Sequence, residues 1–302
     1  MVAPSAVPGR SWGRIALPYA FILPPLIYLG VFMFWPLGRQ IWISLTNTRI
    51  TNPNGGTFVG LRNYERLADD PSFYGSLGVT AVYTVLSVVL GVLLGVICAL
   101  AIDRPFRGRT VARSVLLFGW AVPNVATALI WLWMFNGQSG VMNELAQWAG
   151  LGRVPWLTST ALALPSVLLV TVWQVAPFVM LVVLAALQSV PQEVREAARV
   201  DGADALNVFR AVTLPHIMPS VQLVSLLVAV WSIRRFDIIY LLTGGGPLES
   251  TSTLVVKIRQ VAFEDFQLGM ASAYGVVGLV LALLVAALHL AADRRRARWG
   301  NG

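Results

Sequence analysis

Polar and aromatic side chains interrupt three apolar segments of the chain, and they are the residues best suited to bind a ligand. A polar group inside a membrane is costly unless it faces the interior of a helix bundle or a water-filled cavity. Planar amide and guanidinium groups bond well to hydroxyls, and tryptophan or phenylalanine rings stack on apolar ring faces. The predicted substrate-pathway residues are Trp120, Asn124, Thr171, Gln174, Phe178, Trp231, Ser232, Arg235 and Asp237.

The spacing of these residues predicts shared helix faces. In the run TVWQVAPF, Thr171, Gln174 and Phe178 fall on one face of a helix. Trp231, Ser232 and Arg235 share a face of a later segment, and Trp120 lies one turn from Asn124 in an earlier one. Arg234 lies on a helix face about 100° from that of Arg235, so we expect Arg234 to point elsewhere.

Each candidate also has a purely structural interpretation. The aromatic rings are equally compatible with contacts to lipid. Thr171 and Ser232 suit hydrogen bonds to carbonyls of their own helices. Arg234 and Asp237, three residues apart, suit an ion pair, and Arg235 has the length to reach the membrane surface. His216 and His289 are isolated from each other in the sequence, so no metal site is predicted.

The composition indicates a membrane protein. Hydrophobic residues make up 57% of the 302 and charged residues only 12%, about half the share usual in soluble domains. The formal charge of +8 comes from arginines scattered between apolar runs. This distribution favours contact with anionic headgroups over nucleic acid. The single cysteine, Cys98, lies in an apolar run, which rules out a disulfide within the chain.

Six apolar segments are long enough to cross a membrane as helices, which predicts an all-α integral membrane protein. The predicted spans are about 15–37, 77–102, 114–135, 161–187, 217–242 and 269–292, with tails at 1–14 and 293–302. Pro18, Pro24, Pro25 and Pro36 predict an irregular or kinked first helix, which we read as retained and not as a cleaved signal.

Arginines near the span ends predict the orientation. Four of them crowd the short turn between the second and third spans, and four more lie in the tail DRRRARW. By the positive-inside rule, both termini are predicted to be cytoplasmic. The outer loops also carry arginines, for example Arg49 and Arg62.

A charged insert, EAARVDGADALNVFRAVTLP, separates the fourth and fifth spans within a loop predicted at 190–215. Gly202 suits a turn between two short helices, the second ending before Pro215. From the residues alone, this loop is either a docking element for another protein or a solvated connection.

The insert resembles the EAA loop of permease subunits of ATP-binding-cassette importers. The matching residues are Glu196, Ala197, Ala198, Gly202, Val212, Leu214 and Pro215. Val212 replaces the isoleucine usual in the family. The stretches FVGLRNYERL, WLWMFN and FDIIYLLTGGGP are similar to sugar permeases of the maltose and glycerol-phosphate type. The resemblance extends from about Leu17 to the sixth span.

The resemblance implies a type I importer permease that takes in a sugar, with a disaccharide such as trehalose expected. It implies that Asp201 and the EAA residues couple the spans to an ATPase, and that the polar positions above match a sugar site although most side chains differ. Implied partners are a second permease, two ATP-binding subunits and an external sugar-binding protein. No GxxxxGK[ST] run occurs in the chain, so ATP and Mg²⁺ belong to the partner, and no cofactor is expected here.

Two other classes remain open at this point. A secondary transporter would also have polar spans, but inverted repeats with broken helices are typical of that class, and no convincing repeat is present. A membrane-embedded, lipid-linked glycosyltransferase would need acidic residues clustered at a membrane face. Asp69 and Asp70 are the adjacent acidic pair in an outer loop, and they are typical of a helix start.

Overall fold

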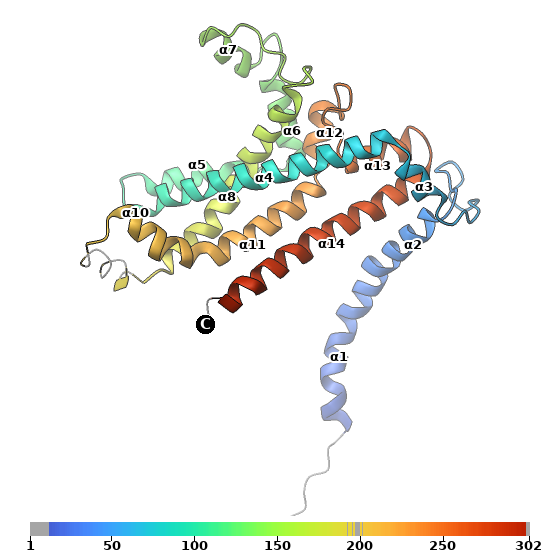
Figure 1. The fold of residues 1–302 in the computed structure, drawn as a ribbon, viewed down its shortest axis with the longest axis horizontal. Coiled ribbons are helices and arrows are strands. Elements are labelled where there is room, and N and C mark those ends of the chain that lie inside the picture. The colour runs from blue at the N-terminus through green and yellow to red at the C-terminus, as the bar shows by residue number, and fades with distance from the viewer. Residues whose placement is uncertain (1–11, 192, 195, 197–199, 201, 300–302) are drawn as a thin grey trace, which may run out of the picture.

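The computed structural model describes residues 12–191, 193–194, 196, 200 and 202–299. Within those residues the chain is helical and forms no strand beyond two isolated bridges. The predicted all-α fold is therefore confirmed. Figure 1 shows α4, α8, α11 and α14 running alongside one another. Their bounds are Pro71–Asp103, Ala163–Gln188, Leu214–Ile233 and Leu268–Trp299.

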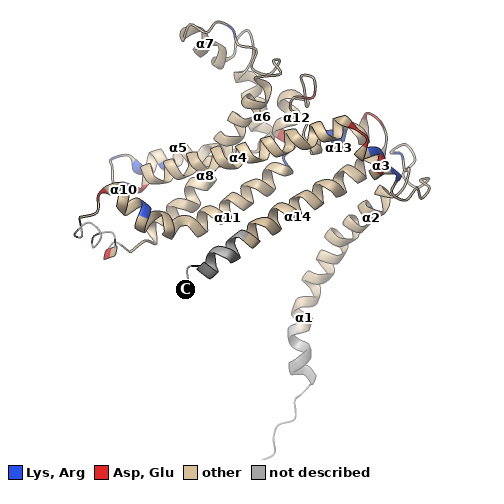
Figure 2. Ribbon diagram, viewed as in Figure 1, with Lys and Arg blue, Asp and Glu red and all other residues tan. Residues whose placement is uncertain are grey.

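Five of the described helical segments are long and apolar enough to cross a membrane, and a sixth span results if one bent pair counts as a single crossing. Figure 2 shows most of the coloured Lys, Arg, Asp and Glu positions near the ends of the long helices and in the segments that connect them. An uncharged middle between charged ends is what a membrane-spanning bundle requires, because charges in hydrocarbon are costly.

The centre of the bundle is the contact between α4 and α8. Gly91 and Gly95 lie one turn apart on the face of α4 that meets α8. A Cβ atom at Gly95 would lie 2.5 Å from the Cβ of Val179, whereas one at Gly91 would lie 3.5 Å from the nearest atom of Val175. Small residues allow this close approach of two backbones, which is the usual device of membrane helix pairs.

The N-terminal helical segment lies outside the contact between α4 and α8, and its C-terminal part packs against α14. It consists of α1 (Trp12–Leu29), a π-helical turn at Gly30–Phe34 and α2 (Trp35–Ser44). The irregularity expected from the prolines is located in this π turn, just before Pro36, because proline has no N–H to continue the hydrogen-bond ladder. In the candidate span Phe21–Ser44 the most apolar stretch has no buried residue, so its apolar surface is left for lipid or a partner chain.

The segment predicted as a third span at 114–135 is not one straight helix. The structure forms α5 (Arg109–Ala121) and α6 (Asn124–Met134), whose axes differ by 99°. The break lies at Val122 and Pro123, which have extended ψ angles of 130° and 143°. The reason is that proline disfavours the helical conformation of the residue before it.

The fifth predicted span also differs from the structure at both ends. The helix does not stop before Pro215: α10 (Ala205–Val208), a π turn (Phe209–Thr213) and α11 follow without interruption. Pro215 is the second residue of α11 and directly follows the π turn, where the helical hydrogen-bond pattern already changes and a missing N–H is more easily accommodated. At the other end, α11 stops at Ile233 and a separate short helix, α12 (Asp237–Thr243), follows, so the proposed extension to 242 is not continuous.

Candidate ligand site

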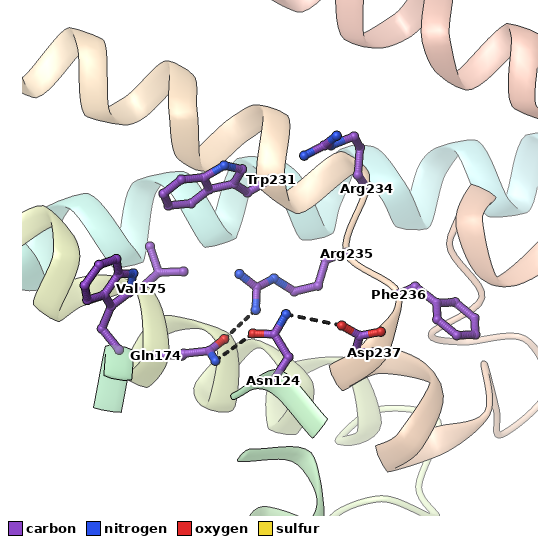
Figure 3. A pocket seen from close by; sticks show the side chains of 9 residues that line it. Asn124, Gln174, Val175, Trp231, Arg234, Arg235, Phe236 and Asp237 are labelled. Carbon is purple, nitrogen blue, oxygen red and sulfur yellow. Dashed lines mark hydrogen bonds between the residues drawn. The ribbon is translucent and has the colours of Figure 1, made fainter. Parts of the chain in front are cut away.

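Two helix breaks meet around a cavity of about 490 Å³. The break between α5 and α6 and the break between α11 and α12 contribute most of its walls, and α8 contributes the rest (Figure 3). The lining residues are Trp120, Asn124, Gln174, Val175, Trp231, Arg234, Arg235, Phe236 and Asp237. The volume falls in the range of pockets that hold small organic ligands, about 300–1,000 Å³.

A chain of hydrogen bonds joins four of the polar side chains across this cavity (Figure 3). Arg235 donates from Nη1 to Oε1 of Gln174 at 2.6 Å, and Gln174 donates from Nε2 to Oδ1 of Asn124 at 2.9 Å. Asn124 then donates from Nδ2 to Oδ2 of Asp237 at 3.2 Å. The chain runs from a cation to an anion through two amides, so each amide is oriented by both neighbours.

The positions of these four residues follow from the local fold. Asn124 and Asp237 are the first residues of α6 and α12, where a carboxylate is favoured by the positive end of the helix dipole. Arg235 lies in the short link between α11 and α12, and Gln174 projects from the middle of α8. Three of the four members therefore depend on the two breaks.

One donor of the network has no partner among the described residues. Arg235 Nε is buried and makes no hydrogen bond there. Leaving a buried polar group unpaired costs about 1–3 kcal/mol, more when it is charged. Arg235 therefore retains hydrogen-bonding capacity for water or a ligand beyond its bond to Gln174.

Three aromatic rings contact one another beside the network, and two of them line the cavity. Trp120 stacks on Phe178 with a centroid distance of 5.5 Å, and Phe178 contacts Trp231 at 5.0 Å. Trp120 and Trp231 line the cavity, whereas Phe178 supports both rings from behind. Apolar ring faces beside amide and guanidinium groups suit a ligand with hydroxyls on a partly apolar ring.

The structure brings six of the nine predicted pathway residues to the cavity: Trp120, Asn124, Gln174, Trp231, Arg235 and Asp237. Phe178, Thr171 and Ser232 do not line it. Thr171 is fully buried, donates to the carbonyl of Val167 and hydrogen-bonds the Tyr83 hydroxyl at 2.7 Å. Ser232 is 2% exposed, and its hydroxyl has no hydrogen-bond partner among the described residues.

The expectation for Arg234 was wrong in its geometry. Arg234 lines the cavity next to Arg235, because α11 ends at Ile233 and the helical rotation of 100° per residue no longer applies. The structure shows no ion pair between Arg234 and Asp237, both of which it describes. Sequence reasoning also missed Val175 and Phe236. Pro123 was the available signal for the first break, but no proline or glycine marks the second.

The predicted coupling segment is only partly described. Ala197, Ala198 and Asp201 lie outside the described residues. Gly202 has φ of 85°, and a Cβ added there would have no atom within 4 Å, so the predicted turn at this glycine is present. Glu196 is helical and exposed, and Leu214 and Pro215 begin α11. Val194, Val200 and Leu206 are exposed apolar residues in the same segment.

The described residues contain no group of three or more histidine, cysteine, aspartate or glutamate side chains able to hold a metal. The cavity itself combines two arginines, one aspartate, two amides and aromatic rings. What this arrangement supports is reversible, non-covalent binding through hydrogen bonds and stacking.

Comparison with known proteins places the chain among transport permeases. Residues 91–298 match the family described as "Binding-protein-dependent transport system inner membrane component". The chain is 36% identical over 283 residues to the trehalose/maltose transport system permease protein MalF of Thermococcus litoralis, covering 93% of this chain and 94% of that protein. It is 32% identical to the sulfoquinovosyl glycerol transport system permease protein SmoG of Agrobacterium fabrum, covering 92% and 90%.

Solved structures show the same fold. A chain of the bacterial alginate ABC transporter, in complex with an alginate pentasaccharide-bound periplasmic protein, superposes with a TM-score of 0.83. The identity is 23%, and the match covers 95% of this chain and 98% of that one. Neither the secondary-transporter nor the glycosyltransferase alternative is supported by these relatives. The chain therefore belongs to the family of binding-protein-dependent transport system inner membrane components, the permease subunits of ABC importers.

Proposed function

We propose that this permease imports a sugar, and that the cavity between the two helix breaks is where the sugar binds during transport. The observation that carries the proposal is the chain from Arg235 through Gln174 and Asn124 to Asp237, beside the rings of the cavity wall. Each of these four side chains can replace its hydrogen bond to a neighbouring side chain with a hydrogen bond to a sugar hydroxyl. Such an exchange conserves hydrogen bonds, so binding stays weak enough to permit release.

A disaccharide such as trehalose is the substrate we propose. Support comes from the relative named as a trehalose/maltose permease, which this chain matches over almost its full length. The lining of the cavity also favours a ligand of this kind. Such a ligand can offer hydroxyls to Arg235 and to Asp237, the two ends of the hydrogen-bonded chain, while it lies against Trp120 and Trp231. A neutral sugar of more than one ring meets both requirements.

The proposed partners are a second related permease, two cytoplasmic ATP-binding subunits and an extracytoplasmic sugar-binding protein. ATP and Mg²⁺ would be bound by the ATP-binding subunits. The exposed residues Val194, Val200 and Leu206 around Gly202 support a docking role for this loop, since neighbouring exposed apolar side chains mark interaction sites.

The proposed orientation has both termini in the cytoplasm, as the arginine-rich turn and tail suggest. The test is a C-terminal protease-cleavable tag in intact spheroplasts. Cleavage by protease added outside would contradict the orientation, and cleavage only after lysis would agree with it.

The function is tested by reconstituting the complete transporter in liposomes with its binding protein and measuring ATP-dependent uptake of trehalose, maltose and sucrose. We expect uptake of at least one disaccharide, trehalose first among them, and none without ATP. Uptake of none of the three, with ATP hydrolysis intact, would contradict the proposed substrate class.

Coupling is tested separately with Gly202→Pro, because proline cannot adopt φ of 85°. We expect the variant to insert and assemble while uptake falls to less than about a tenth of wild type and basal ATP hydrolysis persists, since a distorted contact no longer transmits the motion. Glu196→Ala should act in the same direction more weakly.

Gly108→Pro is the matched control for that experiment. Gly108 also has a positive φ, 88°, with open space around it, and it lies in the turn between α4 and α5. If both proline variants lose uptake equally, backbone distortion alone explains the result. Normal uptake by Gly202→Pro would exclude the coupling role.

A further inference from the structure

A second, smaller cavity lies at the C-terminal end of α12, whereas the first lies at its N-terminal end. Its volume is about 220 Å³. The helix α13 (Leu254–Phe263) and the glycine-rich loop that follows α12 form most of it. The lining residues are Tyr240, Gly244, Gly245, Gly246, Glu249, Ser252, Val256, Arg259, Gln260 and Glu264.

Two stacked rings connect the walls of the two cavities. Phe236 lines the larger cavity and Tyr240 lines the smaller one. Their rings are nearly parallel, with an interplanar angle of 14° and centroids 4.9 Å apart. The guanidinium of Arg259 lies 4.3 Å from the centre of the Tyr240 ring, a distance typical of cation–π contacts. The stacked rings of Phe236 and Tyr240 therefore join the wall of one cavity to the wall of the other.

The rim of the smaller cavity is held in place by contacts to other elements. Glu249 accepts from Lys257 Nζ at 2.8 Å and from Ser72 Oγ at 3.0 Å, which ties the loop to α13 and α4. The hydrogen bond from Lys257 lowers the pKa of Glu249 below its ordinary value. A Cβ at Gly245, where φ is 95°, would approach Val256 to 2.9 Å. The rim is thus built before any ligand arrives.

The charges around this cavity balance one another. Glu249 pairs with Lys257, and Glu264 pairs with Arg259. With both carboxylates already paired, the site offers no excess charge to attract an ion. It does offer carboxylate oxygens, the Gln260 amide, the Ser252 hydroxyl and an aromatic ring. Those groups match a neutral ligand with several hydroxyls.

We infer that the smaller cavity binds one ring of the sugar on its way to the larger cavity, and that Phe236, Tyr240 and Arg259 form the partition the sugar must displace. The inference rests on the proposed function. The volumes, 220 Å³ against 490 Å³, limit the smaller site to a shorter piece of the ligand. Arg259 is bonded to Glu264 while it lies over the Tyr240 ring, so its charge stays paired if the guanidinium leaves the ring.

The inference can be tested by site-specific labelling, because Cys98 is the only cysteine in the chain. In a Cys98→Ala background, single cysteines are placed at Gln260 and Ser252 in the smaller cavity and at Arg234 in the larger one. Gln267→Cys, an exposed position just beyond α13, is the matched control. The complete transporter with its binding protein is labelled with a water-soluble methanethiosulfonate, with and without sugar.

The probe is whichever of trehalose, maltose and sucrose the wild-type transporter takes up, at about ten times its half-saturating concentration. We expect labelling at positions 260 and 252 to slow by about tenfold, because roughly a tenth of the sites remain empty at that concentration. Labelling at position 267 should not change.

The outcomes separate this inference from the proposed function. Protection at position 234 together with unchanged labelling at 260 and 252 would overturn the smaller site and leave the larger one standing. Protection at 267 as well would show a general conformational effect and would also overturn it. Uptake of none of the three sugars would contradict the proposed function and the inference with it.

Discussion

The broken helices and the unbroken ones use polar residues differently. Along α4 and α8, which run without a break, Thr171 and Tyr83 satisfy each other in a fully buried contact. At the two breaks, Asn124, Arg235 and Asp237 face a cavity and form a chain that a ligand can enter. Thr171 and Tyr83 on continuous helices thus serve packing, whereas the polar residues at the breaks, together with Gln174 of α8 that faces them, are available for binding.

The physical reason lies in backbone geometry. A continuous helix presents each side chain to a neighbouring helix at about 8–10 Å between axes, which leaves room only for packed contacts. A bend of 99° between α5 and α6 separates the elements on its inner side, and α8 closes the space with Gln174 and Val175. Binding sites at interrupted helices are also found in secondary transporters.

The largest expected effect is at the breaks. Arg235→Ala removes the charged donor to Gln174 and should reduce uptake efficiency by roughly 10- to 100-fold, since a hydrogen bond to a charged group contributes about 1.5–3 kcal/mol. The amount of assembled complex should stay near wild type. The measurement is initial uptake rate against sugar concentration in liposomes, normalised to permease content.

Arg235→Lys sharpens this prediction. Lysine keeps the positive charge but lacks the planar fork of N–H donors. If Arg235 hydrogen-bonds both Gln174 and a sugar, uptake by the Arg235→Lys variant should therefore stay well below that of wild type. Gln174→Ala should impair uptake in the same range. Full activity of both alanine variants would mean that the larger cavity is not on the sugar path.

A substitution where the continuous helices α4 and α8 meet should lower the amount of folded permease in the membrane and should not change its affinity for sugar. Gly95→Ala would place a methyl 2.5 Å from the Cβ of Val179 and 2.9 Å from the carbonyl oxygen of Ala176. Overpacking of this kind costs about 1–3 kcal/mol, enough to lower the level of folded permease severalfold. Quantitative immunoblotting of membranes, with the half-saturating sugar concentration measured in parallel, checks both halves of the prediction.

Gly91→Ala is the control on the same face of α4. Its added methyl would meet Val175 at 3.5 Å, an ordinary van der Waals distance, so the level of permease should stay near wild type. Equal losses in the two variants would show that the close approach of α4 and α8 at Gly95 is not limiting.

The same contrast explains what the sequence could predict. The long apolar runs predict the spans because hydrocarbon thickness sets their length, and six pathway candidates reach the cavity because buried polar groups are rare. Helical periodicity failed beyond the end of α11, and it also failed for two residues inside helices. It assigned Arg234 to another face, and it placed Thr171 and Ser232 on the pathway although neither lines the cavity. A break without proline or glycine, such as the one after Ile233, comes from tertiary contacts that local propensity does not encode.

The smallest expected effect is at Arg234. Although it lines the larger cavity beside Arg235, it is exposed, and its side chain makes no hydrogen bond or ion pair to any residue that the structure describes. Exposed positions without such contacts usually contribute within about 0.5 kcal/mol, so Arg234→Ala should change uptake less than about threefold. Paired measurement of Arg234→Ala and Arg235→Ala at equal permease content decides the point. A loss at Arg234 as large as that at Arg235 would show that exposure to the cavity, and not membership of the hydrogen-bonded chain, determines which residues at a break handle the sugar.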